Sequence, residues 1–139
     1  MKYLIDTHIF LWLIFEPGKL SKNIIDTLKN SSNQVCISSI SFWEISLKFN
    51  LGKLELNGIS PEELPDIAAQ MDIEVLDVGS KTMASFHQLK KVDKHKDPFD
   101  RIVIGFCLLN DYILVSQDGK FSAYEELGLS TLTAPKIVR

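Results

Sequence analysis

The chain opens with Met1-Lys2-Tyr3-Leu4-Ile5-Asp6-Thr7-His8-Ile9-Phe10, in which a short apolar run meets an acid and then a helix-forming segment. Residues 2–6 have the length and composition of a buried strand, and Thr7 is placed to cap a helix that extends to about Phe15. A strand followed at once by a helix is the repeating unit of parallel α/β proteins. The opening therefore predicts that class.

The rest of the chain continues the alternation. We expect further strands at residues 34–38, 73–78, 113–116 and 130–133, and further helices at 21–30, 39–51, 60–71, 80–89 and 97–110. Gly52 is placed as a C-terminal cap, and Ser60-Pro61-Glu62-Glu63 has the pattern of a capping box. The alternation predicts a three-layer fold, with a central parallel sheet of four or five strands and helices on both faces. We interpret residues 1–139 as a single domain.

The composition is ordinary for a soluble globular protein, with 24% charged and 45% hydrophobic residues and a formal charge of −3. The sequence contains no run of about 18 apolar residues, so it predicts no membrane-spanning helix. The first residues reach Asp6 too early for a signal peptide. Cys36 and Cys107 lie among apolar residues, which is typical of reduced core thiols. We therefore expect a cytoplasmic protein.

Four carboxylates stand where an apolar segment meets a polar turn: Asp6, Glu44, Asp100 and Asp118. An acid embedded in core-forming sequence carries a desolvation penalty unless a partner offsets it. Mg²⁺ or Mn²⁺ would satisfy all four acids together, because hard divalent cations prefer oxygen ligands. Asp6 and Asp118 end predicted strands, and ligands of parallel sheets bind outside the carboxyl ends of the strands. The pattern favours metal-dependent phosphoryl chemistry.

Three of these acids also have structural explanations. Asp6 could be a turn or cap residue, although Thr7 already serves as the cap. Glu44 lies on the apolar face of its helix, which favours an inward role, and an i,i+4 pair with Lys48 is the competing explanation. Asp118 precedes a glycine and could simply form a turn.

Asp97 and Asp100 stand at the start of one helix. Asp97 precedes Pro98 and is well placed as the N-cap, whereas Asp100 turns toward the apolar stripe that contains Ile104. Both acids suit the positive end of the helix dipole. We assign Asp100 to the metal, and Asp97 to capping or to support of the ligands.

Other polar residues are candidates for supporting or substrate-binding roles. Thr7, Ser38 and Ser116 could orient carboxylates or water through hydrogen bonds. One segment is basic and contains Lys90, Lys91, Lys94, Lys96 and Arg101. It could steer a phosphate backbone toward the site, or it could be a solvated loop. The histidines lack the ligand spacing of a zinc site, and His8 is expected on a helix surface. The two tryptophans are interpreted as core residues.

Taken together, four motifs resemble the PIN-domain nucleases, and among them the VapC-type toxins of bacterial toxin–antitoxin pairs. They are Leu4-Ile5-Asp6-Thr7-His8, Phe42-Trp43-Glu44-Ile45, Asp97-Pro98-Phe99-Asp100-Arg101 and Val115-Ser116-Gln117-Asp118. The resemblance covers nearly the whole chain. Each motif is weak alone, but four in register are fairly specific. By motif, the family's acidic quartet corresponds to Asp6, Glu44, Asp100 and Asp118, and Ser116 keeps the hydroxyl of the threonine that the family often has there.

The resemblance implies a PIN-like fold and a Mg²⁺- or Mn²⁺-dependent endoribonuclease whose substrate is RNA. It also implies a homodimer that is silenced by a cognate antitoxin protein, with no membrane partner. Because the quartet is complete, the sequence gives no reason to regard the site as inactive.

Two other classes of function compete with this interpretation. A PIN-like module could bind RNA or a partner protein without cleaving anything. A receiver-like signalling domain is less well supported, because Thr7 follows Asp6 where a second acid would be expected. A phosphatase with an Asp-x-Asp nucleophile is disfavoured because residue 8 is His8.

Overall fold

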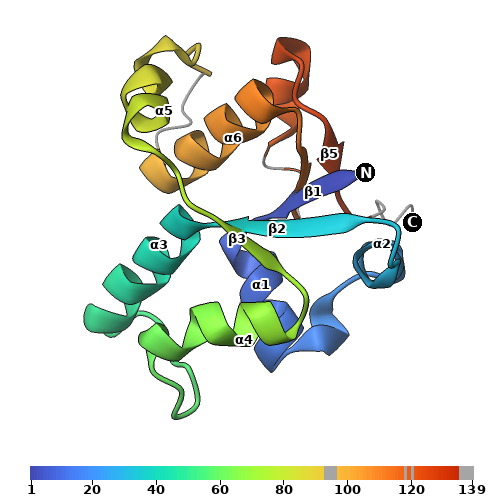
Figure 1. Ribbon diagram of the computed structural model, residues 1–139, viewed down its shortest axis with the longest axis vertical. Coiled ribbons are helices and arrows are strands. Elements are labelled where there is room, and N and C mark those ends of the chain that lie inside the picture. Colours follow the sequence, from blue (N-terminus) through green and yellow to red (C-terminus); the bar gives the residue numbers. More distant parts are fainter. Residues whose placement is uncertain (93–96, 118, 120, 135–139) are drawn as a thin grey trace.

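The computed structural model describes residues 1–92, 97–117, 119 and 121–134 (Figure 1). Its sheet has five strands in the order β3-β2-β1-β4-β5, and every pair of neighbours is parallel. The strands are β1 (Lys2–Ile5), β2 (Gln34–Ser38), β3 (Glu74–Leu76), β4 (Ile113–Val115) and β5 (Thr131–Leu132). The expected parallel sheet is confirmed, with strand ends within two residues of the predicted ranges.

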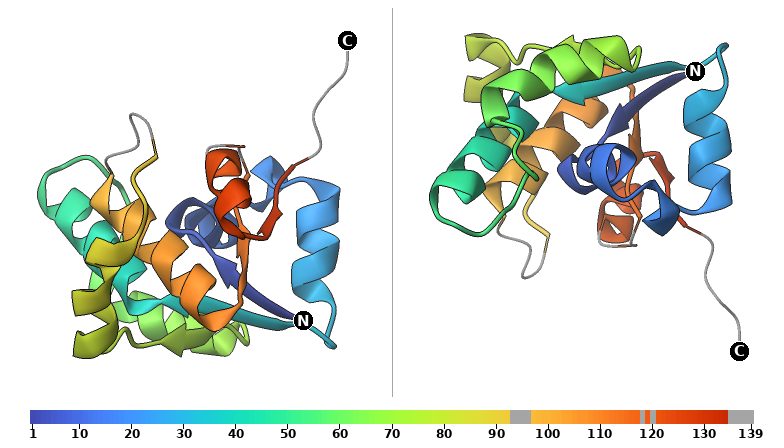
Figure 2. Two further views of the ribbon diagram at one scale, coloured as in Figure 1. Left: turned by 90° about the horizontal axis from the view of Figure 1, so that it is seen from above. Right: turned by 90° about the horizontal axis from the view of Figure 1, so that it is seen from below.

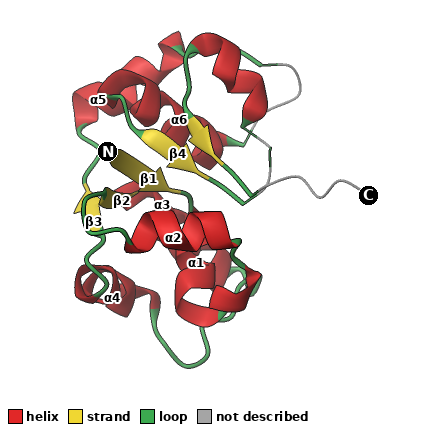
Figure 3. Cartoon of the chain, turned by 90° about the vertical axis from the view of Figure 1, so that its right-hand side faces the viewer, coloured by secondary structure: helices red, strands yellow, loops and turns green. Residues whose placement is uncertain are grey.

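Helices cover both faces of this sheet, as the side view in Figure 3 shows. The helices are α1 (Thr7–Phe15), α2 (Lys22–Lys29), α3 (Ser39–Asn50), α4 (Leu64–Gln70), α5 (Ser80–Ser85) and α6 (Pro98–Asn110). Four short 3₁₀ helices are also present: η1 (Pro17–Lys19), η2 (Pro61–Glu63), η3 (Phe86–Gln88) and η4 (Ser122–Leu127). Helix α3 contacts both α1 and α6, so it joins the two layers of helices.

The core is divided by the sheet into two apolar clusters. Successive residues of a strand point to opposite faces. Ile5 packs into the cluster that contains Phe10 of α1, whereas its neighbour Leu4 packs into the cluster that contains Ile104 of α6. Both clusters contain fully buried side chains, so the sheet has an apolar core on each of its faces.

The start of α1 differs from the prediction. The N-cap is Asp6, not Thr7, and Oδ1 of Asp6 accepts a hydrogen bond from the backbone N–H of Ile9 at 2.9 Å. The strand ends one residue earlier than expected, at Ile5, so the acid occupies the cap position and Thr7 becomes the first helical residue. The prediction erred because both residue types cap helices well.

Other local predictions are confirmed. Asp97 caps α6, with Oδ1 accepting from the N–H of Phe99 at 2.9 Å. Oε2 of Glu63 accepts from the N–H of Ser60 at 2.7 Å, as a capping box requires. Gly52 has a φ of 72°, the left-handed conformation that ends a helix at low cost.

Both cysteines are buried free thiols, as expected. Trp43 contradicts its assignment to the core, because 57% of it is exposed. Of the helices in the described ranges, none is long and apolar enough to cross a membrane.

The sheet's carboxyl end lies where several helices begin. Helices α2 and α3 stand at opposite ends of the molecule (Figure 1 and Figure 2). Because β1 and β2 lead directly into α1 and α3, their carboxyl ends lie on the α3 side, which is where the predicted acids converge.

Candidate functional site

Three of the four predicted acids line one small pocket. Asp6 comes from the junction of β1 and α1, Glu44 from the middle of α3, and Asp100 from the first turn of α6. The pocket has a volume of about 10 Å³, which is room for roughly one water-sized group. Its remaining lining residues are Thr7, His8, Phe99 and Val103. Asp118, the fourth predicted acid, lies outside the described residues.

Asp6 is fixed by hydrogen bonds of both its backbone and its side chain. Its N–H donates to the carbonyl of Val115 at 3.1 Å, which extends the pairing of β1 with β4 by one residue. Its carboxylate caps α1 through Oδ1. Only 5% of the residue is exposed, so this carboxylate has a fixed position at the floor of the site.

Glu44 is a buried carboxylate on the inner face of α3. Oε1 accepts a hydrogen bond from the hydroxyl of Thr7 at 2.7 Å, and Oε2 forms an ion pair with Nζ of Lys48 at 2.6 Å. The hydroxyl oxygens of Thr7 and Ser41 are 2.9 Å apart. Since a hydroxyl has one proton and an ionised carboxylate only accepts, Ser41 is the donor to Thr7 when Thr7 donates to Glu44. Glu44 therefore faces inward and also pairs with Lys48.

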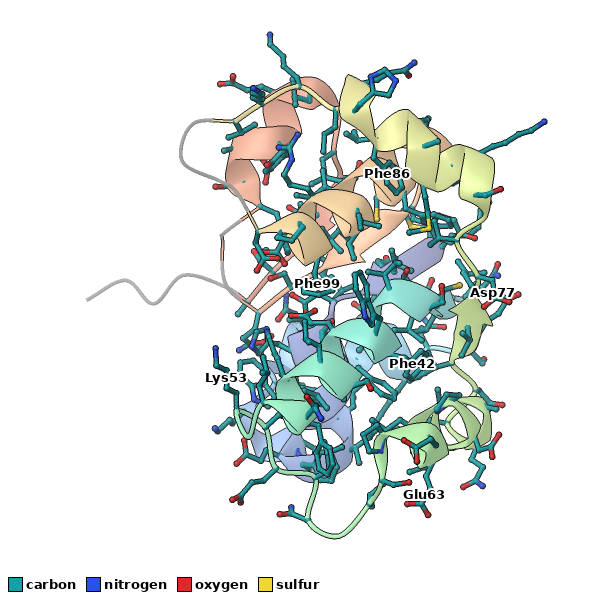
Figure 4. The ribbon with its side chains drawn as sticks, turned by 90° about the vertical axis from the view of Figure 1, so that its left-hand side faces the viewer. Phe42, Lys53, Glu63, Asp77, Phe86 and Phe99 are labelled. Carbon is teal, nitrogen blue, oxygen red and sulfur yellow. The ribbon has the colours of Figure 1, made fainter. Side chains whose placement is uncertain are left out.

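Asp100 is half-buried in the first turn of α6. The turn is fixed by Asp97, whose Oδ1 also accepts from the N–H of Asp100 at 3.3 Å. One residue earlier, Phe99 packs edge-on against Trp43 of α3, with ring centroids 5.1 Å apart (Figure 4). This aromatic contact lies between the helices that carry Glu44 and Asp100.

Two opposing electrostatic effects act on the carboxylates of the pocket. The positive ends of α1 and α6 both meet the pocket and favour carboxylates there, while carboxylates close together repel one another. Within the described part of the chain, no three Asp, Glu, His or Cys side chains are close enough to hold a metal ion as they stand. The donor set nevertheless has the right chemistry for Mg²⁺ or Mn²⁺, because its carboxylate oxygens are hard ligands.

Other predicted site residues have structural partners. Oγ of Ser38 caps α3 by accepting from the N–H of Ile40 at 3.1 Å, and Ser116 is buried at the end of β4. Arg101 donates to the carbonyl of Leu89 at 3.0 Å and to the hydroxyl of Tyr124 at 3.2 Å. Its guanidinium thus ties η3 to η4. Of the predicted basic segment, Lys90 and Lys91 are exposed, and Lys94 and Lys96 lie outside the described residues.

The sequence interpretation missed two features of this region. Ser41, one helical turn before Glu44, was not considered, although its i−3 spacing would have placed it on the same face. A groove of about 560 Å³ also runs from the acidic pocket, with Thr7 and His8 shared between the two. A larger cavity of about 660 Å³ is lined by residues such as Leu13, Val35 and Met71 and contains none of the predicted acids. The acidic pocket is therefore the candidate site because of the acids that line it, and not because of its volume.

Comparison with known proteins identifies the family and the fold. The model of the family described as the PIN domain matches residues 3–127. No curated protein matches the chain by sequence. The fold is similar to that of solved structures of VapBC and other toxin–antitoxin complexes, among them the following three. For VapBC2 from Rickettsia felis bound to a promoter DNA fragment, the identity is 21% and the TM-score 0.69, over 96% of this chain and 98% of the other.

The other two structures are equally complete matches. DNA-bound VapBC from Salmonella typhimurium has 19% identity and a TM-score of 0.65, over 96% of this chain and 98% of the other. A toxin–antitoxin complex from Klebsiella pneumoniae has 18% identity and a TM-score of 0.61, over 97% and 99%. At these identities the likeness concerns the fold, which is shared along the whole length of each chain.

Proposed function

The chain belongs to the PIN domain family, and from this premise we propose that it is a metal-dependent endoribonuclease, the toxin of a bacterial toxin–antitoxin pair that inhibits translation. The single observation that carries the proposal is the convergence of Asp6, Glu44 and Asp100, from three separate elements, on one pocket. Carboxylates brought together in this way repel one another unless a cation binds between them. The fold shared with VapBC assemblies supports the toxin assignment.

In this proposal Asp6, Glu44, Asp100 and Asp118 hold Mg²⁺ or Mn²⁺. A cation bound there would activate water and stabilise the charge that develops on the phosphate and the leaving oxygen. The chain's own contribution is to fix the ligands. The cap on α1 holds Asp6, Thr7 orients Glu44, and the Asp97 cap keeps Asp100 directed into the pocket.

The direct test is cleavage of a labelled RNA with Mg²⁺, Mn²⁺ or EDTA. Asp6→Asn should abolish cleavage without unfolding the protein, because asparagine also caps helices. Glu44→Gln and Asp100→Asn should do the same. Asp66→Asn changes an exposed acid on α4 and should retain wild-type activity. Wild-type cleavage in EDTA, or near-wild-type cleavage by any two of the three site variants, would refute the proposal.

A catalytically silent PIN-like module is the alternative function. It predicts that the protein binds RNA or a partner protein but cleaves no RNA with either metal. A receiver-like domain has no support from the comparisons. Growth arrest on expression of the wild-type chain, absent for Asp6→Asn and relieved by co-expression of an antitoxin, would favour the toxin over the silent module.

We also propose that the protein acts as a homodimer in the cytoplasm. The supporting observation is an exposed apolar stripe along α3, at i, i+4 and i+8, formed by Trp43, Leu47 and Leu51, which are 57%, 39% and 56% exposed. Stripes of this kind on soluble proteins commonly mark interfaces. Light scattering should give a dimer for the wild type and a monomer for Leu47→Glu. A wild-type monomer at micromolar concentration would contradict this part of the proposal.

A further inference from the structure

Lys48 belongs to two neighbouring features of the molecule. Its Nζ lies 2.6 Å from Oε2 of Glu44, inside the acidic site. The same side chain lines the groove of about 560 Å³ that leaves this site. The side chain of Glu44 is 8% exposed, whereas that of Lys48 is 39% exposed. The carboxylate is therefore fixed, and the ammonium is the partner that is free to move toward solvent.

Lys48 and a metal ion compete for the same carboxylate. Oε1 of Glu44 accepts a hydrogen bond from Thr7 and Oε2 pairs with Nζ of Lys48, so a cation that binds Glu44 meets the positive charge of Lys48. Two positive charges on one carboxylate repel each other strongly in a partly buried site. A lysine on a flexible four-carbon stem can leave when a divalent cation arrives. Metal binding would thus release the ammonium.

The groove provides a place for the released ammonium. It begins at Thr7 and His8, which also line the acidic pocket, and contains a second cation, Lys53, in the loop after α3 (Figure 4). Trp12, which is partly buried, lines the same groove, and Nζ of Lys19 lies 5.9 Å from the centre of its ring. Cations beside an aromatic ring are features that bind single-stranded nucleic acid. An RNA strand that leaves the pocket here would bring phosphates to Lys48 and Lys53.

We propose that Lys48 is a positioning residue that exchanges partners, pairing with Glu44 when no metal is bound and with a substrate phosphate in the groove once metal has displaced it. This inference rests on the proposed ribonuclease function and adds the path of the RNA and the role of Lys48. The exchange keeps a cation beside Glu44 in both states. It also couples the two ligands, because metal binding frees the cation that the RNA needs.

The inference predicts effects of opposite sign on the two ligands. In Lys48→Met, removal of the competitor should raise the affinity for Mn²⁺, titrated without RNA and followed by electron paramagnetic resonance, on the order of tenfold. The same variant should bind RNA more weakly in Ca²⁺, and the slope of log affinity against log salt should fall by about 0.7. In Lys48→Arg, the slope of log RNA affinity against log salt should stay near that of the wild type.

Two matched controls isolate the exchange. Lys53→Met changes the other cation of the groove, which has no ion pair with Glu44, so its RNA slope should fall while its Mn²⁺ affinity stays at the wild-type value. Lys22→Met changes an exposed lysine on α2 and should alter neither quantity. If Lys48→Met folds poorly, the double variant Lys48→Met with Glu44→Gln leaves no unpaired buried charge, and its RNA slope should still be reduced.

Three results would overturn the inference. Unchanged or weaker Mn²⁺ binding by Lys48→Met would make Lys48 a purely structural partner of Glu44. If the salt dependence of RNA affinity were unchanged in both Lys48→Met and the double variant, RNA would not bind in the groove. Loss of antitoxin binding with unchanged RNA binding would assign the groove to a protein partner instead. The Mn²⁺ titration needs no cleavage, so its outcome is distinct from a failure of the ribonuclease assay.

Discussion

The hydroxyl of Thr7 donates a hydrogen bond to Oε1 of Glu44 at 2.7 Å and so links the first turn of α1 to the middle of α3. Both residues are buried, and the two lie 37 positions apart in the chain. Hydrogen bonds to charged groups are among the stronger ones in proteins. This bond fixes the orientation of a carboxylate that could otherwise rotate away from the acidic pocket.

Thr7→Val should therefore destabilise the protein, although it keeps the shape of the side chain. The loss of a donor to a buried carboxylate should lower the free energy of unfolding by about 1–3 kcal/mol. Thr7→Ser keeps the hydroxyl and should lose much less. Urea denaturation at neutral pH measures both changes. Equal losses for valine and serine would mean that the methyl group, rather than the hydrogen bond, holds the two helices together.

A second prediction concerns the cap of α6. Asp97→Ala removes the acceptor for the N–H groups of Phe99 and Asp100 and should cost about 0.5–2 kcal/mol of stability, with an indirect loss of activity. Asp97→Ser should recover most of the stability, because serine also caps helices. If Asp97→Ser folded normally but bound Mn²⁺ more weakly, Asp97 would be a ligand and not only a cap.

Packing between α6 and η3 gives a third prediction. Gly105 lies so close to Phe86 that an added Cβ would stand 2.7 Å from Cδ1 of that ring. Figure 4 labels Phe86 beside α6. Gly105→Ala should therefore destabilise the protein by about 1–3 kcal/mol, the usual range for overpacking. In the background of Phe86→Leu, the same alanine should cost much less, and a double-mutant cycle by thermal denaturation measures the difference. Equal costs in both backgrounds would show that the ring is not the obstacle.

The thiol of Cys36 gives a fourth prediction, on alkaline stability. Burial, together with the nearby Glu74, raises the pKa of Cys36 to about 11. An exposed thiol in the unfolded chain titrates near about 8.5. The unfolded state therefore releases its proton first, and the stability from this thiol, complete below about pH 8.5, is lost as the pH rises toward about 11.

Cys36→Ala should consequently show a shallower loss of stability between about pH 8.5 and pH 11 than the wild type does. Urea denaturation over this interval measures the slopes. Subtraction of the wild-type curve removes the contribution of lysines, which both proteins share. Identical slopes would mean that the folded protein does not suppress ionisation of this thiol.

The sequence predicted the fold well, because strand and helix periods and turn residues are local signals. Asp97, Ser60 and Gly52 each carry such a signal, and each has the predicted role. The 3₁₀ helix η4 was not predicted, since its residues follow no regular period. Trp43 was placed in the core, but it lies on the outer side of α3 against Phe99, and that contact depends on how two helices cross.

The convergence of three acids on one pocket was predicted from the sequence, but their hydrogen-bond partners were not. The positions of Asp6, Glu44 and Asp100 follow from strand ends and helix faces, so the sequence could bring them together. The hydrogen bond from Thr7 to Glu44 was not predicted, and the inward position of Glu44 and its pair with Lys48 were treated as alternatives although the structure has both. The spacing i,i+4 predicts the pair with Lys48, whereas the contact with Thr7 joins α1 to α3 and depends on how these two helices pack.

The most direct test of the central claim is anomalous scattering from crystals of the protein grown with Mn²⁺. The account predicts a strong anomalous peak in the acidic pocket, within coordination distance of Asp6 and Asp100, with Nζ of Lys48 turned away from Glu44. The peak should disappear in Asp6→Asn. A peak only elsewhere on the molecule, or none at Mn²⁺ concentrations that support RNA cleavage, would contradict the account.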